Sequence, residues 1–290
     1  MRKKAQKWMY PLKFFRSMCS PDTDAEDSGD KCTSDNNRRR EEQGKSESSR
    51  LRQSYFPDTV GFMDDMDKCL RNHPDPELTP YALEVLKAEH IERMKAWIKS
   101  NSPEILLIQW SGAGGAVDRR IRTTDLTLEL IGIYQDVTSG TVLSHFCSWP
   151  AEQTNGDYAL IIQDFIAQLL EKHADKFRHF HEDLTSYSSQ ETVEDTDRLW
   201  KLFEKCIVFA KPSSVAMMLD NVNSMYRTGA VDGPDEWTHD FYDRLKRLME
   251  VLAGNGILSK VILTSRSPKT ISYMKDVASS HIKISKSSGD

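Results

Sequence analysis

The sequence predicts an α/β fold in which helices flank a parallel sheet of five strands. From about residue 78 onward, short apolar runs of strand length alternate with segments whose apolar residues recur at helical spacing. A helical segment separates each run from the next, which is the connection that parallel strands require. Polar groups follow the ends of three runs, at 111–120, at Asp220 and at 264–266, and parallel strands bring such ends to one edge of a sheet.

The first half of the folded region contains two of the expected strands. A helix is predicted over 81–100, because Thr79 and Pro80 provide a start signal and the apolar residues after them fall near one helical face. This helix leads directly into an apolar strand at 105–110. A glycine-rich stretch and a helix follow, and a second buried strand is predicted at 141–146. The segment DYALIIQDFIAQLLEKH then forms a helix with an apolar stripe.

The second half supplies the other three strands. The segment DTDRLWKLFEKCIVFA fits a helix, and a short apolar run after it ends in Asp220. Another helix is predicted over 237–253, where the turn Gly254-Asn255-Gly256 ends it. The segments SKVILTSRSP and SHIKIS predict the fourth and fifth strands.

The N-terminal residues 1–77 have a different composition. The first eighteen carry six basic groups, four aromatic residues and no acid, so a disordered basic tail is expected, with contact of residues 2–16 with a membrane surface or an organelle-targeting segment as the alternatives. Secretion and membrane spanning are disfavoured, because Pro11 interrupts a stretch without a long apolar run. Residues 19–55 contain almost no large apolar side chain and predict a linker. The expected organisation is a disordered region 1–77 and a folded domain 78–290.

Bulk composition narrows the functional classes. A formal net charge of −5 predicts no general affinity for nucleic acid. The five cysteines are odd in number and widely spaced, which argues against a disulfide framework and against a structural zinc site (Cys19, Cys32, Cys69, Cys147 and Cys206). A reducing compartment is therefore expected, and the predicted location is cytoplasmic.

The segment ILLIQWSGAGGAVDRRIRTTD has the layout of a phosphate-binding loop, in which an apolar strand runs through glycines into a helix. In such a loop the glycine amides wrap around phosphate, a lysine reaches the β and γ phosphates, and a hydroxyl holds Mg²⁺. No lysine follows the glycines in this chain. The alternative is that the glycines only form a tight turn between strand and helix.

Six short segments occur in an order that is typical of one protein family. They are a helix with Trp97, the start Ser111-Gly112, HFCSW, AQLL, MLDNVN around Asp220, and LTSRSP. From about Trp97 to Ile284 the chain resembles the NACHT domains of fungal STAND proteins, a branch of the P-loop NTPases. The resemblance implies a three-layer P-loop NTPase-like fold, and a domain that in the family links an N-terminal effector to C-terminal sensor repeats.

The glycine-rich loop departs from the family's motif at three of its four functional positions. Gly115 matches the second glycine, but Val117 stands at the third, Asp118 at the lysine and Arg119 at the hydroxyl that binds magnesium. Val117 resists positive φ because it is β-branched. Replacing lysine by an aspartate turns attraction into repulsion, a swing of up to about 8 kcal/mol for unit charges about 4 Å apart at an effective dielectric of about 20.

The family's second motif, which binds magnesium and activates water, is also altered around Asp220. Asp220 matches the carboxylate that holds Mg²⁺ through water, while Asn223 and Ser224 replace the acids that polarise the attacking water. Arg266 matches an arginine near the γ-phosphate, and without phosphate it is expected to pair with Asp220 or Asp118. Asp220 has the alternative role of capping a turn at the strand end. The resemblance thus implies a vestigial nucleotide site made of Gly112, Gly114, Gly115, Arg119, Asp220 and Arg266.

The predicted function is a non-catalytic NACHT/STAND-like regulatory or protein-interaction module with impaired nucleotide binding, with protein partners and no cofactor. The first alternative is an atypical NTPase that binds ATP or GTP, in which Arg119 or Arg120 replaces the lysine and Asp220 holds Mg²⁺. The second alternative is a truncated copy without activity of its own. His173, His179 and His181 do not share one helical face, so a solvated helix rather than a metal site is expected there.

Overall fold

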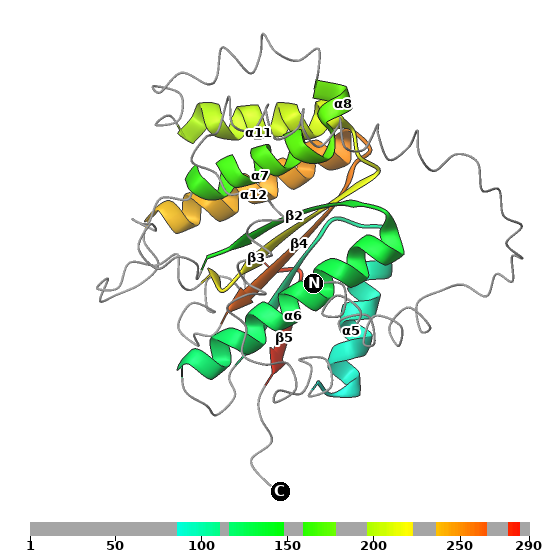
Figure 1. Ribbon diagram of the computed structural model, residues 1–290, viewed down its shortest axis with the longest axis vertical. Helices are drawn as coiled ribbons and strands as arrows, with labels where there is room; N and C mark the ends of the chain where they lie inside the picture. The colour runs from blue at the N-terminus through cyan, green and yellow to red at the C-terminus, as the bar shows by residue number, and fades with distance from the viewer. Residues whose placement is uncertain are drawn as a thin grey trace, which may run out of the picture. The chain divides into compact units, whose positions relative to one another are not determined.

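The computed structural model describes residues 86–110, 116–147, 159–177, 196–222, 236–265 and 278–284 (Figure 1). Side chains are described from residue 123 in the helix that starts at 116 and from residue 240 in the helix that starts at 236. The predicted tail 1–77 lies outside these ranges.

Five strands form one sheet in the order β2-β3-β4-β1-β5, and all four neighbouring pairs are parallel. The prediction of a parallel five-stranded sheet is confirmed. The strands are β1 (Glu104–Trp110), β2 (Thr141–Phe146), β3 (Ser214–Asp220), β4 (Leu258–Ser265) and β5 (Ser280–Ile284). Each lies within one or two residues of the apolar run that predicted it, because buried strands consist almost entirely of apolar residues.

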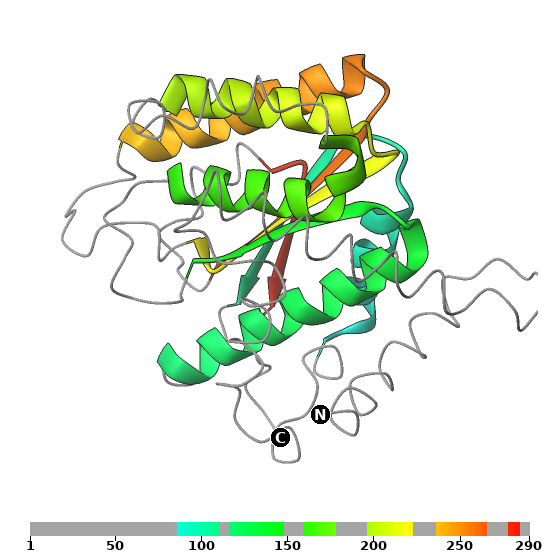
Figure 2. The same cartoon turned by 45° about the horizontal axis from the view of Figure 1, so that its top comes forward.

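Three helices flank this sheet. They are α5 (Ala88–Lys99), α6 (Ala116–Thr138) and α12 (Glu236–Gly254). Helices α5 and α6 lie on one face, and α12 lies against β4 on the other (Figures 1 and 2). The predicted three-layer arrangement is therefore confirmed.

Alternating residues of the strands form the core on the face that α5 and α6 cover. Leu106 and Ile108 of β1 point to this face, as does Met218 of β3, because side chains along a strand point to opposite faces in turn. They pack against Trp97 of α5 and Leu130 of α6 in one cluster of buried residues. The helical spacing that predicted a helix over 81–100 identified the buried face of α5, but the helix begins only at Ala88, because Leu86 and Lys87 are not helical.

The remaining described helices belong to a second compact unit. By contact density the chain divides into a sheet unit, which contains the five strands with α5, α6 and α12, and a helical unit. The helical unit contains α7 (Ala159–Lys172), α8 (Ala174–Phe177) and α11 (Thr196–Ala210).

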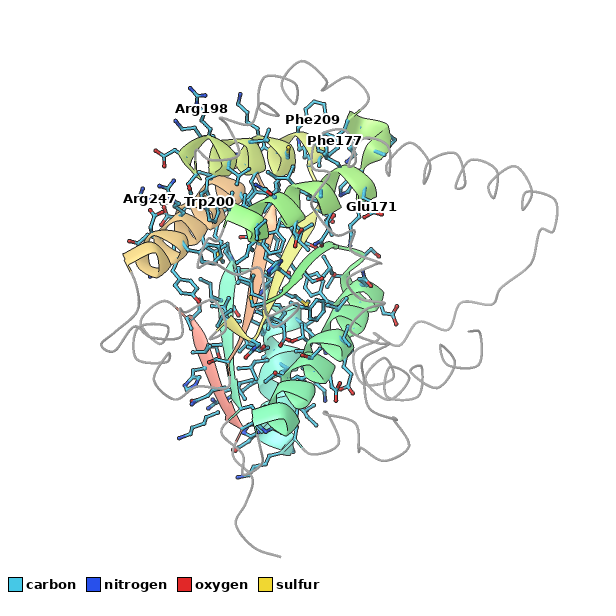
Figure 3. All side chains as sticks on the ribbon, turned by 60° about the vertical axis from the view of Figure 1, so that its left-hand side comes forward. Glu171, Phe177, Arg198, Trp200, Phe209 and Arg247 are labelled. Atoms are coloured by element: carbon cyan, nitrogen blue, oxygen red, sulfur yellow. The ribbon has the colours of Figure 1, made fainter. Side chains whose placement is uncertain are left out.

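Aromatic pairs hold the helical unit together. Phe165 of α7 lies 5.6 Å from Phe203 of α11, measured between ring centroids. The rings of Phe177 of α8 and Phe209 of α11 are the same distance apart, and Figure 3 shows this second pair. His173 stands in the turn between α7 and α8, where its side chain is half-buried and burial lowers its pKa. This environment differs from the solvated helix predicted there, because the chain turns and packs again directly after α7. His179 and His181 lie outside the described residues.

None of the helices in the described ranges combines the length and the apolar character that crossing a lipid bilayer requires. The proposed membrane contact of residues 2–16 lies outside these ranges.

Candidate functional site

The carboxyl ends of β1, β3 and β4 lie at one edge of the sheet, as their parallel pairing requires. Leu219 of β3 is in register with Leu263 of β4, and Phe146 of β2 is in register with Asp220. The last residues of β3 and β4 are therefore neighbours. In the sequence the glycine-rich loop follows β1 and Arg266 follows β4, while Asp220 is the last residue of β3. This edge of the sheet is where ligands bind in many α/β proteins.

Asp220 is the centre of a group of hydroxyls at this edge, of which that of Thr124 is partly buried and those of Thr127 and Thr264 are buried. Its side chain is fully buried. One carboxylate oxygen, Oδ2, accepts a hydrogen bond of 2.6 Å from the Thr124 hydroxyl of α6, and the other, Oδ1, accepts one of 2.6 Å from the Thr264 hydroxyl of β4. Hydrogen bonds to an ionised carboxylate are among the stronger ones in proteins. Asp220 therefore links α6, β3 and β4.

Thr127 makes a weaker contact with the same carboxylate. Its hydroxyl donates to the backbone carbonyl of Thr123 at 2.9 Å and lies 3.3 Å from Oδ1 of Asp220. A hydroxyl has one hydrogen, so the shorter bond to the carbonyl is the main one. Thr124 and Thr127 are three residues apart, which places both hydroxyls on the same side of α6.

The backbone after Asp220 bends sharply and is fixed by Thr264. Asn221 is fully buried and has φ of 56°, in the left-handed region that asparagine adopts more readily than most residues. Its backbone N–H donates to the Thr264 hydroxyl at 2.8 Å, and that hydroxyl donates in turn to Asp220. The backbone N–H of Cys147 donates to the Asp220 carbonyl at 3.1 Å. Thr264 thus joins the bend to the carboxylate.

Of the predicted site residues, only Asp220 has a described side chain. Gly112, Gly114, Gly115 and Arg266 lie outside the described residues, and so do Asn223 and Ser224. Val117, Asp118, Arg119 and Arg120 belong to α6, of which only the backbone is described at these positions. The predicted pairing of Arg266 with Asp220 or Asp118 therefore stays a prediction.

Two residues that contact Asp220, Thr124 and Thr127, were not predicted from the sequence. In the family's motif the metal-binding hydroxyl stands at the position of Arg119, so the sequence indicates that it is lost. In the structure a hydroxyl from the same helix does reach Asp220, but it comes five residues later, from Thr124. The three threonines in RTTDLT were the available signal, since buried hydroxyls on a mostly apolar helix face need partners.

The described site can position hydroxyls and accept hydrogen bonds, and it holds few groups for acid-base chemistry. In the described ranges, no three histidine, cysteine, aspartate or glutamate side chains gather as they would around a metal ion. Ser144 and His145 are consecutive in β2, so their side chains point to opposite faces.

Replacing Thr264 by valine is expected to destabilise the protein by about 2 kcal/mol, because the variant removes the acceptor of the Asn221 N–H and a donor to Asp220. Thr264→Ser keeps the hydroxyl and is the matched control, with an expected loss of less than about half that amount. Chemical denaturation of the two variants measures the difference. Unchanged stability of Thr264→Val, with a larger loss in Thr264→Ser, would mean that the methyl group and not the hydroxyl matters at this position.

Comparisons with known proteins identify no family. No protein-family model matches the sequence, and no curated protein matches it. Among solved structures the chain is similar to one described as "Structure of E. coli MS115-1 HORMA:CdnC:Trip13 complex", with a TM-score of 0.33 and 11% sequence identity. The likeness covers 85% of this chain and 63% of that one, so this chain spans less than two thirds of its length. A likeness of this size carries no functional argument.

Proposed function

We propose that this protein is a non-catalytic, NACHT/STAND-like regulatory or protein-interaction module whose nucleotide site has become a structural link. The observation that carries the proposal is the environment of Asp220. Its side chain is fully buried, and each carboxylate oxygen accepts a hydrogen bond from a threonine hydroxyl. A carboxylate that holds Mg²⁺ needs lone pairs directed at the ion or at its water shell.

The sequence of the glycine-rich loop supports the same proposal. Asp118 stands where the family has the lysine that contacts phosphate, and Arg119 stands where it has the hydroxyl. An acidic group at the first position opposes the charge of a triphosphate. In this proposal the phosphate contacts are lost and Asp220 has a structural role. The surface of the folded domain, rather than a bound ligand, then carries the function.

The experiment is a calorimetric titration of the full chain with Mg-ATP and Mg-GTP. We expect no binding heat at ligand concentrations of about 1 mM, which corresponds to a binding free energy weaker than about −4 kcal/mol. A measured micromolar dissociation constant for either nucleotide would reject the proposal.

One observation favours a second candidate, an atypical ATP- or GTP-binding P-loop NTPase. Thr124 supplies to Asp220 the hydroxyl that the aligned motif lacks. In this candidate Arg119 or Arg120 replaces the lysine, and Thr124 and Asp220 hold Mg²⁺ together. An NTP-turnover assay distinguishes the two, with Thr124→Val and Thr124→Ser as a matched pair. Turnover that valine abolishes and serine keeps would establish the second candidate, and the absence of turnover in the unmodified protein supports the first.

Under the first proposal the partners are proteins and the location is cytoplasmic, in line with the scattered cysteines. No cofactor takes part in this function.

A further inference from the structure

Lys260 is a fully buried lysine near the amino ends of the strands, at the end of the sheet opposite to the Asp220 site. It lies near the start of β4, in register with Glu104 of β1 on one side and Ala216 of β3 on the other. It points to the same face as Ile262, two residues later, which belongs to the core beneath α5 and α6. Its ammonium nitrogen Nζ lies 5.5 Å from the centre of the Trp97 ring of α5 and 3.8 Å from Oε2 of Glu104.

Three buried polar atoms, two on the buried face of α5 and one on β4, have no hydrogen-bond partner among the described residues. They are Nζ of Lys260, Nε1 of Trp97 and Nδ1 of His90. The distance from Lys260 to Glu104 allows electrostatic attraction but is too long for a hydrogen bond. Each of these atoms would be hydrated in water, so the docking of α5 carries their desolvation as a cost.

The favourable side of the docking is mainly apolar burial, to which the Lys260 ammonium over the Trp97 ring adds a cation–π contact. Met94, Trp97 and Ile98 of α5 are buried against the sheet. Arg93 adds a hydrogen bond of 3.1 Å from its guanidinium to the backbone carbonyl of His281 in β5. The N-terminal cap residue Lys87 makes no side-chain capping bond. The attachment of α5 is thus a balance between these favourable contacts and the burial of the three polar atoms that have no hydrogen-bond partner among the described residues.

We propose that α5 is a releasable cover of the sheet, and that the buried ammonium of Lys260 sets how readily it is released. Release hydrates Lys260, Trp97 and His90, and it uncovers an apolar strip of β1 and β5 that includes Ile108 and Ile282. The connection between α5 and β1, residues 100–103, is the hinge. The inference does not depend on the function of the Asp220 site.

The titration of Lys260 agrees with this geometry. Burial lowers the pKa of Lys260 below its ordinary value of 10.5, and the nearby Glu104 carboxylate opposes that change. A lowered pKa means that the docked arrangement disfavours the charged form of the amine. The carboxylate of Glu104 limits this cost without removing it.

Hydrogen exchange of the full chain, read at single-amide resolution, tests the proposal. In the unmodified protein, the amides of residues 93–99 in α5 are expected to exchange through a partial opening, at least about tenfold faster than those of β3 after correction for intrinsic rates. A tenfold difference corresponds to about 1.4 kcal/mol. If α5 and β3 open with the same free energy, then α5 is released only when the whole fold opens, and the proposal is wrong.

Two substitutions test the role of Lys260. Lys260→Met keeps the length of the side chain and removes the charge, so exchange of the α5 amides is expected to slow by about tenfold. Glu104→Gln keeps an oxygen for the hydroxyls of Ser100 and Ser102, which donate to Oε1, but it removes the compensating charge, so exchange is expected to become faster. In the Lys260→Met background, Glu104→Gln is expected to change little.

The matched control is Lys283→Met, which removes a lysine with an exposed side chain from β5 of the same sheet. It is expected to leave exchange of the α5 amides unchanged. The same slowing in Lys283→Met as in Lys260→Met would contradict the proposal, as would unchanged or faster exchange in Lys260→Met.

Discussion

Asp220→Ala is expected to lower the free energy of unfolding by about 3 kcal/mol or more. The substitution removes a fully buried carboxylate and leaves the hydroxyls of Thr124 and Thr264 without their acceptor. It also breaks the link between α6 and the ends of β3 and β4. Urea denaturation of the two proteins, followed by circular dichroism, measures the loss.

The matched variant Asp220→Asn separates the structural role from a metal-binding role. The amide keeps the shape of the carboxylate and one acceptor oxygen, so a smaller loss of about 1–2 kcal/mol is expected from the structural role. A carboxylate that serves mainly to hold a metal ion commonly reduces the stability of the metal-free protein. Unchanged or increased stability of Asp220→Asn would therefore argue against the structural role.

Gly140→Ala is expected to destabilise the protein by about 2–3 kcal/mol. Gly140 precedes β2, where a methyl group in place of its hydrogen would lie 2.3 Å from Oγ of Ser214 and 2.9 Å from a ring carbon of Tyr134. Both distances are shorter than ordinary contacts, and the neighbours are buried in the sheet unit, so the Ser214 and Tyr134 side chains or the strand must shift. The melting temperature of the variant measures this effect.

Two further variants check the steric origin of this loss. Gly254→Ala places a methyl group at the end of α12, where no described atom outside the adjoining residues and the helix backbone lies within 4 Å, and it is expected to leave stability unchanged or raise it by up to about 1 kcal/mol. Adding Ser214→Ala to Gly140→Ala removes the nearest atom and is expected to recover part of the loss. If the double variant recovers nothing, the Ser214 contact is not the cause.

The strands were predictable because their burial leaves a strong pattern in the sequence. The run TVLSHF predicted the bounds of β2, an edge strand that is buried at all but one position, and the run ending in Asp220 predicted the end of β3, a central strand. The helices between the strands are predictable from the length of the connecting segments and from the helical spacing of their apolar residues. These features depend on local sequence, and they determine the parallel pairing once each connection is helical.

The contacts of the site were less predictable because they join residues far apart in the chain. Thr124 and Asp220 are separated by 96 residues, and nothing in the local sequence of either indicates the other. In the family's motif the hydroxyl stands at a fixed position after the glycines, whereas in this protein Thr124, on a later turn of α6, supplies it. The burial of Lys260 was not predictable for a similar reason. A single lysine in an apolar strand is expected to lie at an exposed strand end, and its burial depends on contacts with α5, which is far away in the sequence.

The most direct test of the account is a crystal of the protein grown with ATP and Mn²⁺, in which the anomalous signal of manganese reports occupancy at Asp220. We predict no metal peak beside the carboxylate and intact hydrogen bonds from Thr124 and Thr264. A manganese ion coordinated by Asp220, with the triphosphate held by the amides of the glycine-rich turn, would contradict the claim that this site has become a structural link.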